Sequence, residues 1–236
     1  MSARRARASS MASAAGAAEG HAGAAPLRLA LPKGRVLGEA IELFARAGLD
    51  IAAVAGRSRR LVHDFAGHGG AGLRIYVVRD SDVPTYVEYG AADLGIAGAD
   101  VLEEQGRDLY QPLDLGIGRC RLSVAEPEAH PVDDRSRLHL RVATKFPNLT
   151  RRYLESRGIV ADVIALHGSI ELGPLTGLCD RIVDLVSTGE TLRQNHLREV
   201  ETLMEVSAHL VVNRASLKLR RVAIDGLVAR LRGAVR

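Results

Sequence analysis

The sequence predicts an α/β protein, because short apolar runs alternate with segments of helical periodicity along most of its 236 residues. Two segments repeat one pattern, DLGIAG from Asp93 and DLVSTG from Asp184. The repeat is either a coincidence in a glycine-rich chain or a sign of two similar lobes. In the second case each lobe presents a strand, a tight turn and a helix N-terminus to a shared cleft, where open α/β sheets bind ligands.

Order is expected to begin with a strand in LRLALPKGR that ends at Pro32. Apolar residues at helical spacing then predict a helix in VLGEAIELFARAGLD, with Gly48 placed for its C-cap. DVPTYVEYG predicts a second helix, with Asp82 as N-cap and Pro84 in the first turn. Further strands are expected in LRIYVV at 73–78 and in ADLGIAG at 92–98.

The composition is typical of a globular protein, since 47% hydrophobic residues can form a core in one large domain or two small lobes. No apolar run reaches the roughly 18 residues that a membrane span needs. Cys120 and Cys179 are isolated and match no metal-binding spacing, which favours a reducing cytoplasm. Residues 1–26 are rich in Ala, Gly and Ser, so we expect a disordered tail.

The net charge of +4 does not indicate a nucleic-acid partner. Arg4, Arg5 and Arg7 against Glu19 supply +2 of it, and the rest of the chain is close to neutral with only 3% aromatic residues over the whole sequence. A glycine motif is also misleading. GHGGAG at 67–72 matches G-x-G-x-x-G, but a strand follows it where the dinucleotide fingerprint needs a helix, so a hairpin turn is expected.

The stretch VDLVSTGETLRQN at 183–195 carries the main functional signal. A buried strand that turns into a helix through Ser187, Thr188 and Gly189 leaves backbone N–H groups free to bind an anion. The glycine allows close approach, and the hydroxyls add donors. Asp184 just before this turn suits a ribose diol or a magnesium ion on a diphosphate. The pattern therefore indicates either a phosphate cradle preceded by a sugar-binding acid, or an ordinary capped helix.

The sequence resembles the ATP phosphoribosyltransferase family, which catalyses the first step of histidine biosynthesis. ELGPLTGLCDRIVDLVSTGETL, from Glu171 to Leu192, is similar to the family signature, with Cys179 where a smaller residue is usual. Over 27–236 the resemblance extends to LALPKGR, SRRL, RDSDVPTYVEYGAADLGIAGADVLEE, GRCRLSVAEP and RVATKFPNLTRRYLESRGI.

The resemblance implies a magnesium-assisted glycosyl transfer in which N1 of the adenine of ATP displaces pyrophosphate from phosphoribosyl pyrophosphate. Arg35 and Arg59 match family arginines that stabilise the leaving pyrophosphate, so they are the expected catalytic residues. The expected substrate-binding residues are Lys33, Gly34, Glu171, Asp184, Ser187, Thr188, Gly189, Glu190 and Thr191.

The family's fold implies a two-lobed α/β structure similar to type II periplasmic binding proteins, with a cleft between the lobes. We expect lobe 1 at 27–116, lobe 2 at 117–205, and a return to lobe 1 at 206–236 through one strand in EVETLMEVSAHLVVN and one C-terminal helix. The 44 residues after Leu192 leave no room for a regulatory domain. The resemblance thus implies a short-form catalytic subunit, with a separate regulatory subunit that resembles a histidyl-tRNA synthetase.

Two other classes of function stay open, because a fold does not settle function. The same lobes could capture an anion without chemistry, as a solute-binding protein does. They could also form a purely structural subunit. Release of pyrophosphate from the two substrates separates the enzyme from both.

Overall fold

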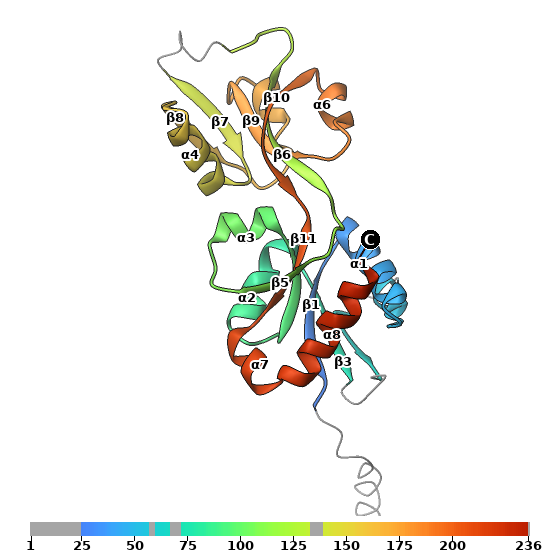
Figure 1. Cartoon of the computed structure of the whole chain (residues 1–236). Helices are drawn as coiled ribbons and strands as arrows, with labels where there is room; N and C mark the ends of the chain where they lie inside the picture. The colour runs from blue at the N-terminus through green and yellow to red at the C-terminus, as the bar shows by residue number, and fades with distance from the viewer. Residues whose placement is uncertain (1–24, 57–59, 67–71, 133–138, 236) are drawn as a thin grey trace, which may run out of the picture.

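The computed structural model describes residues 25–56, 60–66, 72–132 and 139–235, which form two sheets one above the other (Figure 1). The first sheet has the strand order β2-β3-β1-β4-β11-β5. Its strands are β1 (Leu27–Pro32), β2 (Val62–Phe65), β3 (Leu73–Val78), β4 (Leu94–Gly98), β5 (Tyr110–Asp114) and β11 (Ala208–Val212). Its helices are α1 (Arg35–Arg46), α2 (Val83–Glu88), α3 (Ala99–Gln105), α7 (Arg214–Leu219) and α8 (Arg221–Ala234), with short 3-10 turns at Ala52–Ala55 and Asp80–Asp82.

The second sheet has the order β10-β6-β9-β7-β8 and three helices. Its strands are β6 (Cys120–Pro127), β7 (Leu140–Thr144), β8 (Ala161–Ala165), β9 (Arg181–Val186) and β10 (Leu197–Val206). The helices are α4 (Pro147–Ser156), α5 (Leu172–Leu175) and α6 (Glu190–Gln194). The two-lobed α/β prediction is confirmed.

The two sheets share one pattern of strand directions. In the first, β3, β1 and β4 are parallel neighbours. Next to them, β11 pairs antiparallel with β4, and β5 pairs antiparallel with β11. In the second, β8, β7 and β9 are parallel, and β6 and then β10 add antiparallel strands. The strands β4 and β9, which carry DLGIAG and the start of DLVSTG, occupy equivalent central places. The internal repeat therefore reflects two similar lobes.

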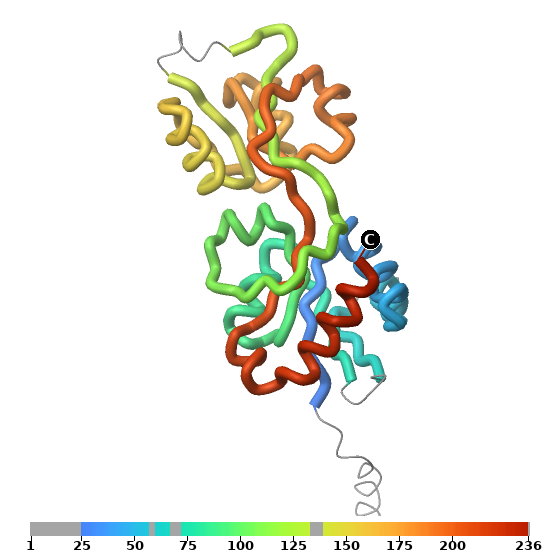
Figure 2. Tube along the Cα trace, viewed as in Figure 1, coloured from blue at the N-terminus to red at the C-terminus, as the bar shows by residue number. Residues whose placement is uncertain are grey.

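The chain passes between the lobes twice, from β5 into β6 and from β10 into β11. Figure 2 shows the two passages running side by side, and the strands they join are paired in each sheet. The 199–213 segment was predicted as one strand, and this is wrong. It breaks at Ser207, where the partner of the chain changes from β6 in one lobe to β4 and β5 in the other.

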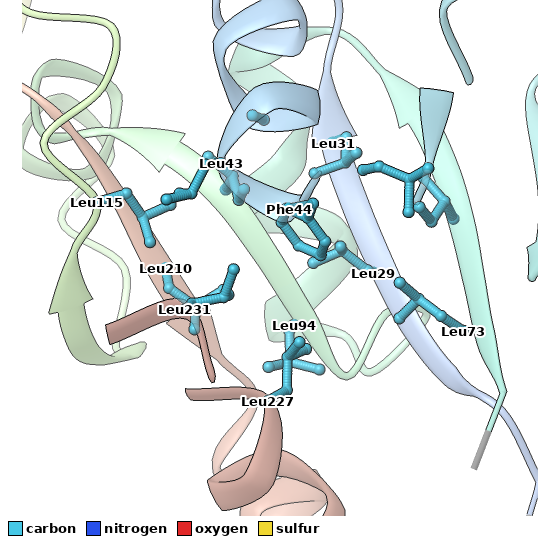
Figure 3. Packing of buried hydrophobic residues seen from close by; sticks show 14 of the residues in the cluster. Leu29, Leu31, Leu43, Phe44, Leu73, Leu94, Leu115, Leu210, Leu227 and Leu231 are labelled. Carbon is cyan, nitrogen blue, oxygen red and sulfur yellow. The ribbon is translucent and has the colours of Figure 1, made fainter. Parts of the chain in front are cut away.

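The core of the first lobe lies between the sheet and helices α1 and α8. Leu29 and Leu31 of β1 meet Leu43 and Phe44 of α1, all fully buried, with α8 residues closing the other side (Figure 3). Burial of each such side chain contributes roughly 1.5–3 kcal/mol before entropy is counted. Because α8 completes this core, the C-terminal segment is part of the lobe that begins at β1.

Most predicted elements of the N-terminal half are confirmed within about two residues. Strands β1, β3 and β4 match, and Gly48 adopts the left-handed φ of 74° just after the C-cap of α1. Helix α2 has Asp82 at its N-cap, although that side chain makes no capping hydrogen bond. The predicted single C-terminal helix is wrong. It is divided into α7 and α8 at Arg220, which has φ of −130° and whose guanidinium binds Asp93 at 2.9 Å.

Several predictions concern residues outside the described ranges. The tail at 1–26 lies almost wholly outside them, as does most of the turn expected at 67–72, although β2 and β3 on either side pair antiparallel. The lobe boundaries at 116/117 and 205/206 stay predictions. Among the described residues, no helix has the length and apolar character to cross a membrane.

Candidate active site

The two lobes turn the carboxyl ends of their parallel strands toward each other. In open α/β sheets this edge is where ligands bind. Each of these strands is followed by polar residues, which are Lys33 to Arg35 after β1, Arg79 and Asp80 after β3, Asp100 after β4, Lys145 after β7, His167 after β8 and Ser187 to Thr191 after β9. A cavity of about 530 Å³ lies between the lobes, lined by Arg79, Asp80, Ser81, Val101, Glu104, Gln105, Lys145, Phe146 and His167.

The turn after β9 has the geometry expected of an anion cradle. Gly189 is the N-cap of α6 with φ of 79°, a left-handed conformation that favours glycine. Ser187, Thr188 and Thr191 are exposed, and Thr188 Oγ1 accepts a hydrogen bond from the Glu190 N–H at 3.3 Å. No residue in the described ranges accepts a hydrogen bond from the backbone N–H of Thr188 or Gly189, so both remain available to a ligand.

Glu190 differs from its neighbours in the cradle. Its carboxylate accepts hydrogen bonds from Arg193 at 2.6 Å and from Gln194 at 2.7 Å. These bonds hold the side chain along α6, where the negative charge also stabilises the N-terminus of the helix. Its predicted role in substrate binding stays a prediction.

Asp184 lies on β9, three residues before Ser187, the first residue of the cradle, and its side chain is partly buried. The pKa of its carboxyl is raised to about 6, chiefly by burial and also by the nearby Glu171, while the Leu185 N–H and Lys145 oppose the shift. The Leu185 N–H donates to Asp184 Oδ1 at 2.8 Å. The structure therefore brings together the two predicted acids, Asp184 and Glu171, which are 13 positions apart in the sequence.

The β1–α1 turn supplies the basic side of the cleft. Lys33, Gly34 and Arg35 are all exposed, and a Cβ on Gly34 would meet nothing within 4 Å. Arg35 Nη2 donates to the Gly118 carbonyl at 3.2 Å, so the guanidinium lies beside the passage from β5 to β6. Arg59 lies outside the described residues.

Electrostatic contacts connect the two sides of the cleft. Arg35 interacts with the Cys120 thiol, which also interacts electrostatically with Asp100. Asp100 in turn interacts with Lys145, and Lys145 with Asp184. Burial raises the pKa of Asp100, which is 5% exposed. Predicted residues on opposite lobes therefore interact through Cys120, Asp100 and Lys145, to which the sequence assigned no role in the site.

Lys145, Asp100, Arg79 and Asp80 are among the cleft residues that the sequence did not reveal. Lys145 Nζ reaches across the lobes to Asp80 Oδ2 at 3.1 Å. Each of these residues comes within two positions of the end of a parallel strand, which would have served as a signal had the parallel strands been known. No motif in the sequence told parallel strands from antiparallel ones.

A second interlobe contact closes the cleft near the cavity. Both oxygens of the Glu104 carboxylate on α3 accept backbone N–H groups at the start of α4, from Asn148 at 2.9 Å and from Leu149 at 2.9 Å. The α4 N-cap, Phe146, offers no side-chain acceptor, so an acid from the other lobe provides the cap. Within the described ranges, no group of three or more His, Cys, Asp or Glu side chains is placed to hold a metal ion.

Comparisons with known proteins agree with this geometry. The family model described as HisG: ATP phosphoribosyltransferase matches residues 79–233. An ATP phosphoribosyltransferase of Acidithiobacillus ferrooxidans is 53% identical over 212 residues, which are 89% of this chain and 97% of the relative. One from Sorangium cellulosum is 54% identical over 209 residues, 89% of this chain and 96% of the relative.

Two solved structures are also similar. The ATP phosphoribosyl transferase (HisG:HisZ) complex from Thermotoga maritima has 34% identity and a TM-score of 0.74, covering 89% of this chain and 98% of that chain. The crystal structure of Tv2483 bound to L-arginine has 14% identity and a TM-score of 0.53, covering 89% and 83%, and bears on the fold alone. The lobes, the cleft and these relatives lead to one conclusion: the chain belongs to the ATP phosphoribosyltransferase family, whose reaction opens histidine biosynthesis.

Proposed function

We propose that this chain binds phosphoribosyl pyrophosphate across the interlobe cleft and transfers the phosphoribosyl group to N1 of the adenine of ATP. The 5-phosphate binds the cradle of Ser187, Thr188, Gly189, Glu190 and Thr191, and the ribose hydroxyls face Asp184 and Glu171. The observation that carries the proposal is the arrangement on β9, where a partly buried acid and an open cradle follow each other at the carboxyl end of one strand.

Charge separation dictates the roles of the remaining residues. A dissociative glycosyl transfer builds positive charge on the ribose and negative charge on the departing pyrophosphate. Lys33, Gly34 and Arg35 present two cations and an open backbone on the opposite side of the cleft from the cradle, and Arg59 is assigned to the same group. Donors aimed at developing charge in a water-poor cleft contribute more than donors in bulk water.

Asp184 suits the ribose side of the reaction. Above a pH of about 6 its carboxyl is ionised, although it is largely enclosed. An ionised acid accepts hydrogen bonds from two sugar hydroxyls and stabilises positive charge at the adjacent anomeric carbon. The acid needs no proton transfer for this role, since pyrophosphate leaves as a stable anion.

Magnesium fits this site as a companion of the substrate. The described residues hold no three-ligand cluster, but Mg²⁺ in such sites keeps several waters and takes one or two carboxylates plus substrate phosphates. Asp184 and Glu171 are the residues that would contact it. When bound, the ion neutralises pyrophosphate charge.

We further propose that this chain is a short-form catalytic subunit that works in the cytoplasm with a separate regulatory subunit resembling a histidyl-tRNA synthetase. The similar Thermotoga maritima structure is a HisG:HisZ complex, and the alignment covers 98% of that chain. Two passages between the lobes give such a subunit a means of control, because a contact on either lobe changes how the cleft closes.

The test is product formation by the purified chain. Incubation with ATP, phosphoribosyl pyrophosphate and Mg²⁺ should release pyrophosphate and give one product with the mass of phosphoribosyl-ATP, and omission of either substrate should abolish both. Tight binding of phosphoribosyl pyrophosphate with no pyrophosphate release, with and without the regulatory subunit, would instead identify an anion-binding protein.

A further inference from the structure

We infer that Arg121, held by Glu199, is a positioning residue that sets the shape of the phosphate cradle. The inference rests on the proposed binding of phosphoribosyl pyrophosphate. Arg121 is the second residue of β6 and lies opposite Val186, the last residue of β9. Its Nη1 donates to the carbonyl of Ser187 at 3.4 Å, which is the first peptide of the cradle.

The guanidinium is itself fixed by a two-point ion pair. Arg121 Nε donates to Glu199 Oε1 at 2.6 Å and Nη2 donates to Glu199 Oε2 at 2.5 Å. This fork-to-fork geometry specifies the orientation of the guanidinium as well as its position. The side chains of Arg121 and Glu199 are only 32% and 26% exposed, so the pair is partly shielded from water.

Other hydrogen bonds fix the acid of the pair. Ser123 Oγ donates to Glu199 Oε1 at 2.7 Å, and Thr202 Oγ1 donates to the same oxygen at 3.2 Å. The network therefore ties together β6, β10 and the exit of β9. Of the groups in it, Arg121 is the one that extends to the cradle, through its remaining guanidinium nitrogen.

The hydrogen bond from Arg121 to the Ser187 carbonyl does more than hold the sheet together. The strands are already joined by the paired β6 and β9 backbones, whereas the exposed Ser187 carbonyl lies past the end of that pairing. Fixing this peptide fixes the direction of the N–H groups that follow it at Thr188 and Gly189. Because the loop is already ordered, phosphate binding loses less free energy to ordering it.

Ligands that occupy different parts of the site provide the test. Ribose 5-phosphate carries only the group that the cradle binds, and pyrophosphate carries only the leaving group. By calorimetry, Arg121→Met should weaken ribose 5-phosphate and phosphoribosyl pyrophosphate by about the same factor, at least roughly 10-fold, as for loss of a charge-assisted hydrogen bond. Pyrophosphate affinity should stay within twofold. Glu199→Gln should show a smaller effect of the same pattern.

A matched control lies two residues along β10. Glu201 pairs with Arg157 and accepts the Tyr153 hydroxyl at 2.6 Å, so Glu201→Gln breaks a similar network away from the cradle and should leave all three affinities unchanged. Arg121→Lys covers the case in which the methionine variant does not fold. It keeps the charge but loses the fork, and should weaken the same two ligands.

Unchanged affinity of ribose 5-phosphate in folded Arg121→Met or Arg121→Lys protein, or equal loss for pyrophosphate, would overturn the inference. Failure of the parent protein to bind phosphoribosyl pyrophosphate would instead remove the proposed function. The two failures are therefore distinguishable.

Discussion

At the scale of single residues, the site combines a backbone conformation that favours glycine with a carboxyl group whose partial burial costs stability when it is ionised. Gly189 occupies a left-handed conformation, and Asp184 is an acid enclosed at a pKa of about 6. Such features are typical of functional sites and persist because the surrounding structure holds them. Cys179, the departure from the family signature, is explained by packing, since its Sγ would lie only 2.6 Å from a Cβ on Gly173. The glycine makes room for the larger residue.

The cradle predicts a clear effect of Gly189→Val. The bulk added at the turn should hinder close approach of phosphate, so phosphoribosyl pyrophosphate affinity should fall at least roughly 10-fold in calorimetry. Gly158→Val is the control, because Gly158 after α4 also has a left-handed φ, of 66°, with nothing within 4 Å of its Cβ position. Both variants carry a similar backbone strain of about 1–2 kcal/mol. Equal affinities in the two variants would remove the cradle from the site.

The raised pKa of Asp184 predicts a trade between stability and function. The folded pKa of about 6 lies above the ordinary pKa of 3.8 for an aspartate, so the unfolded chain loses this proton first as pH rises. Stability from this group therefore falls between about pH 4 and 6 and stays lower above that window. Asp184→Asn should raise the free energy of unfolding by about 1–3 kcal/mol at pH 7.5 and by little at pH 4.

Urea unfolding at the two pH values measures that difference. The same variant should bind phosphoribosyl pyrophosphate more weakly, because it loses the ionised acceptor. Lower stability of Asp184→Asn at pH 7.5 would show that the carboxylate is stabilised in the fold rather than penalised by it.

At the scale of elements, the sequence was most informative where a local pattern determines structure. Strands β1, β3 and β4 and helices α1 and α2 follow from apolar spacing and from residues such as Pro32 and Gly48. The passage from one lobe to the other at Ser207 could not be predicted in this way. Apolar and polar residues alternate through the whole of 199–213, and only the strands with which this segment pairs change. The break at Arg220 depends on Asp93, which is 127 residues away in the sequence.

In the candidate site, too, some residues could be found from local sequence and others could not. Ser187, Thr188 and Gly189 could be found locally, because a strand, small residues and a helix follow one another. Lys145 and Asp100 could not, since their relevance depends on which strands are parallel and on how two lobes face each other. Those facts are set by long-range pairing.

The interlobe cap of α4 predicts a local effect of Glu104→Ala. Loss of a charged acceptor at a helix N-terminus typically costs about 1 kcal/mol, so the amides of Asn148 and Leu149 should exchange hydrogen several-fold faster. Glu103→Ala is the neighbouring control, because Glu103 makes only an exposed contact with Arg152 at 3.6 Å through its carboxylate. Unchanged protection in Glu104→Ala would mean that the lobes do not meet there in solution.

At the scale of the whole molecule, the fold places two half-sites on separate lobes joined by two passages. Catalysis by such a molecule depends on closure, and closure is open to control from outside the cleft. Coupling to an inhibitor requires a second site whose ligand prefers one global state. The proposed regulatory subunit would supply that site.

This arrangement predicts that the chain alone turns over and is insensitive to histidine. Addition of the synthetase-like subunit should raise the initial rate and confer inhibition by histidine. Initial rates against histidine concentration, with and without the subunit, measure both effects. Strong inhibition of the chain alone would locate a histidine site within this chain and contradict the short-form assignment.

The central claim, that the two faces of the cleft act in one reaction, is tested most directly by single-turnover release of pyrophosphate. Arg35→Ala removes a charge opposite the cradle, and its rate should fall on the order of 10²-fold with saturating substrates. Arg46→Ala, an exposed arginine at the other end of the same helix, should stay within twofold of the parent. A single-turnover rate for Arg35→Ala within twofold of the parent would contradict the account.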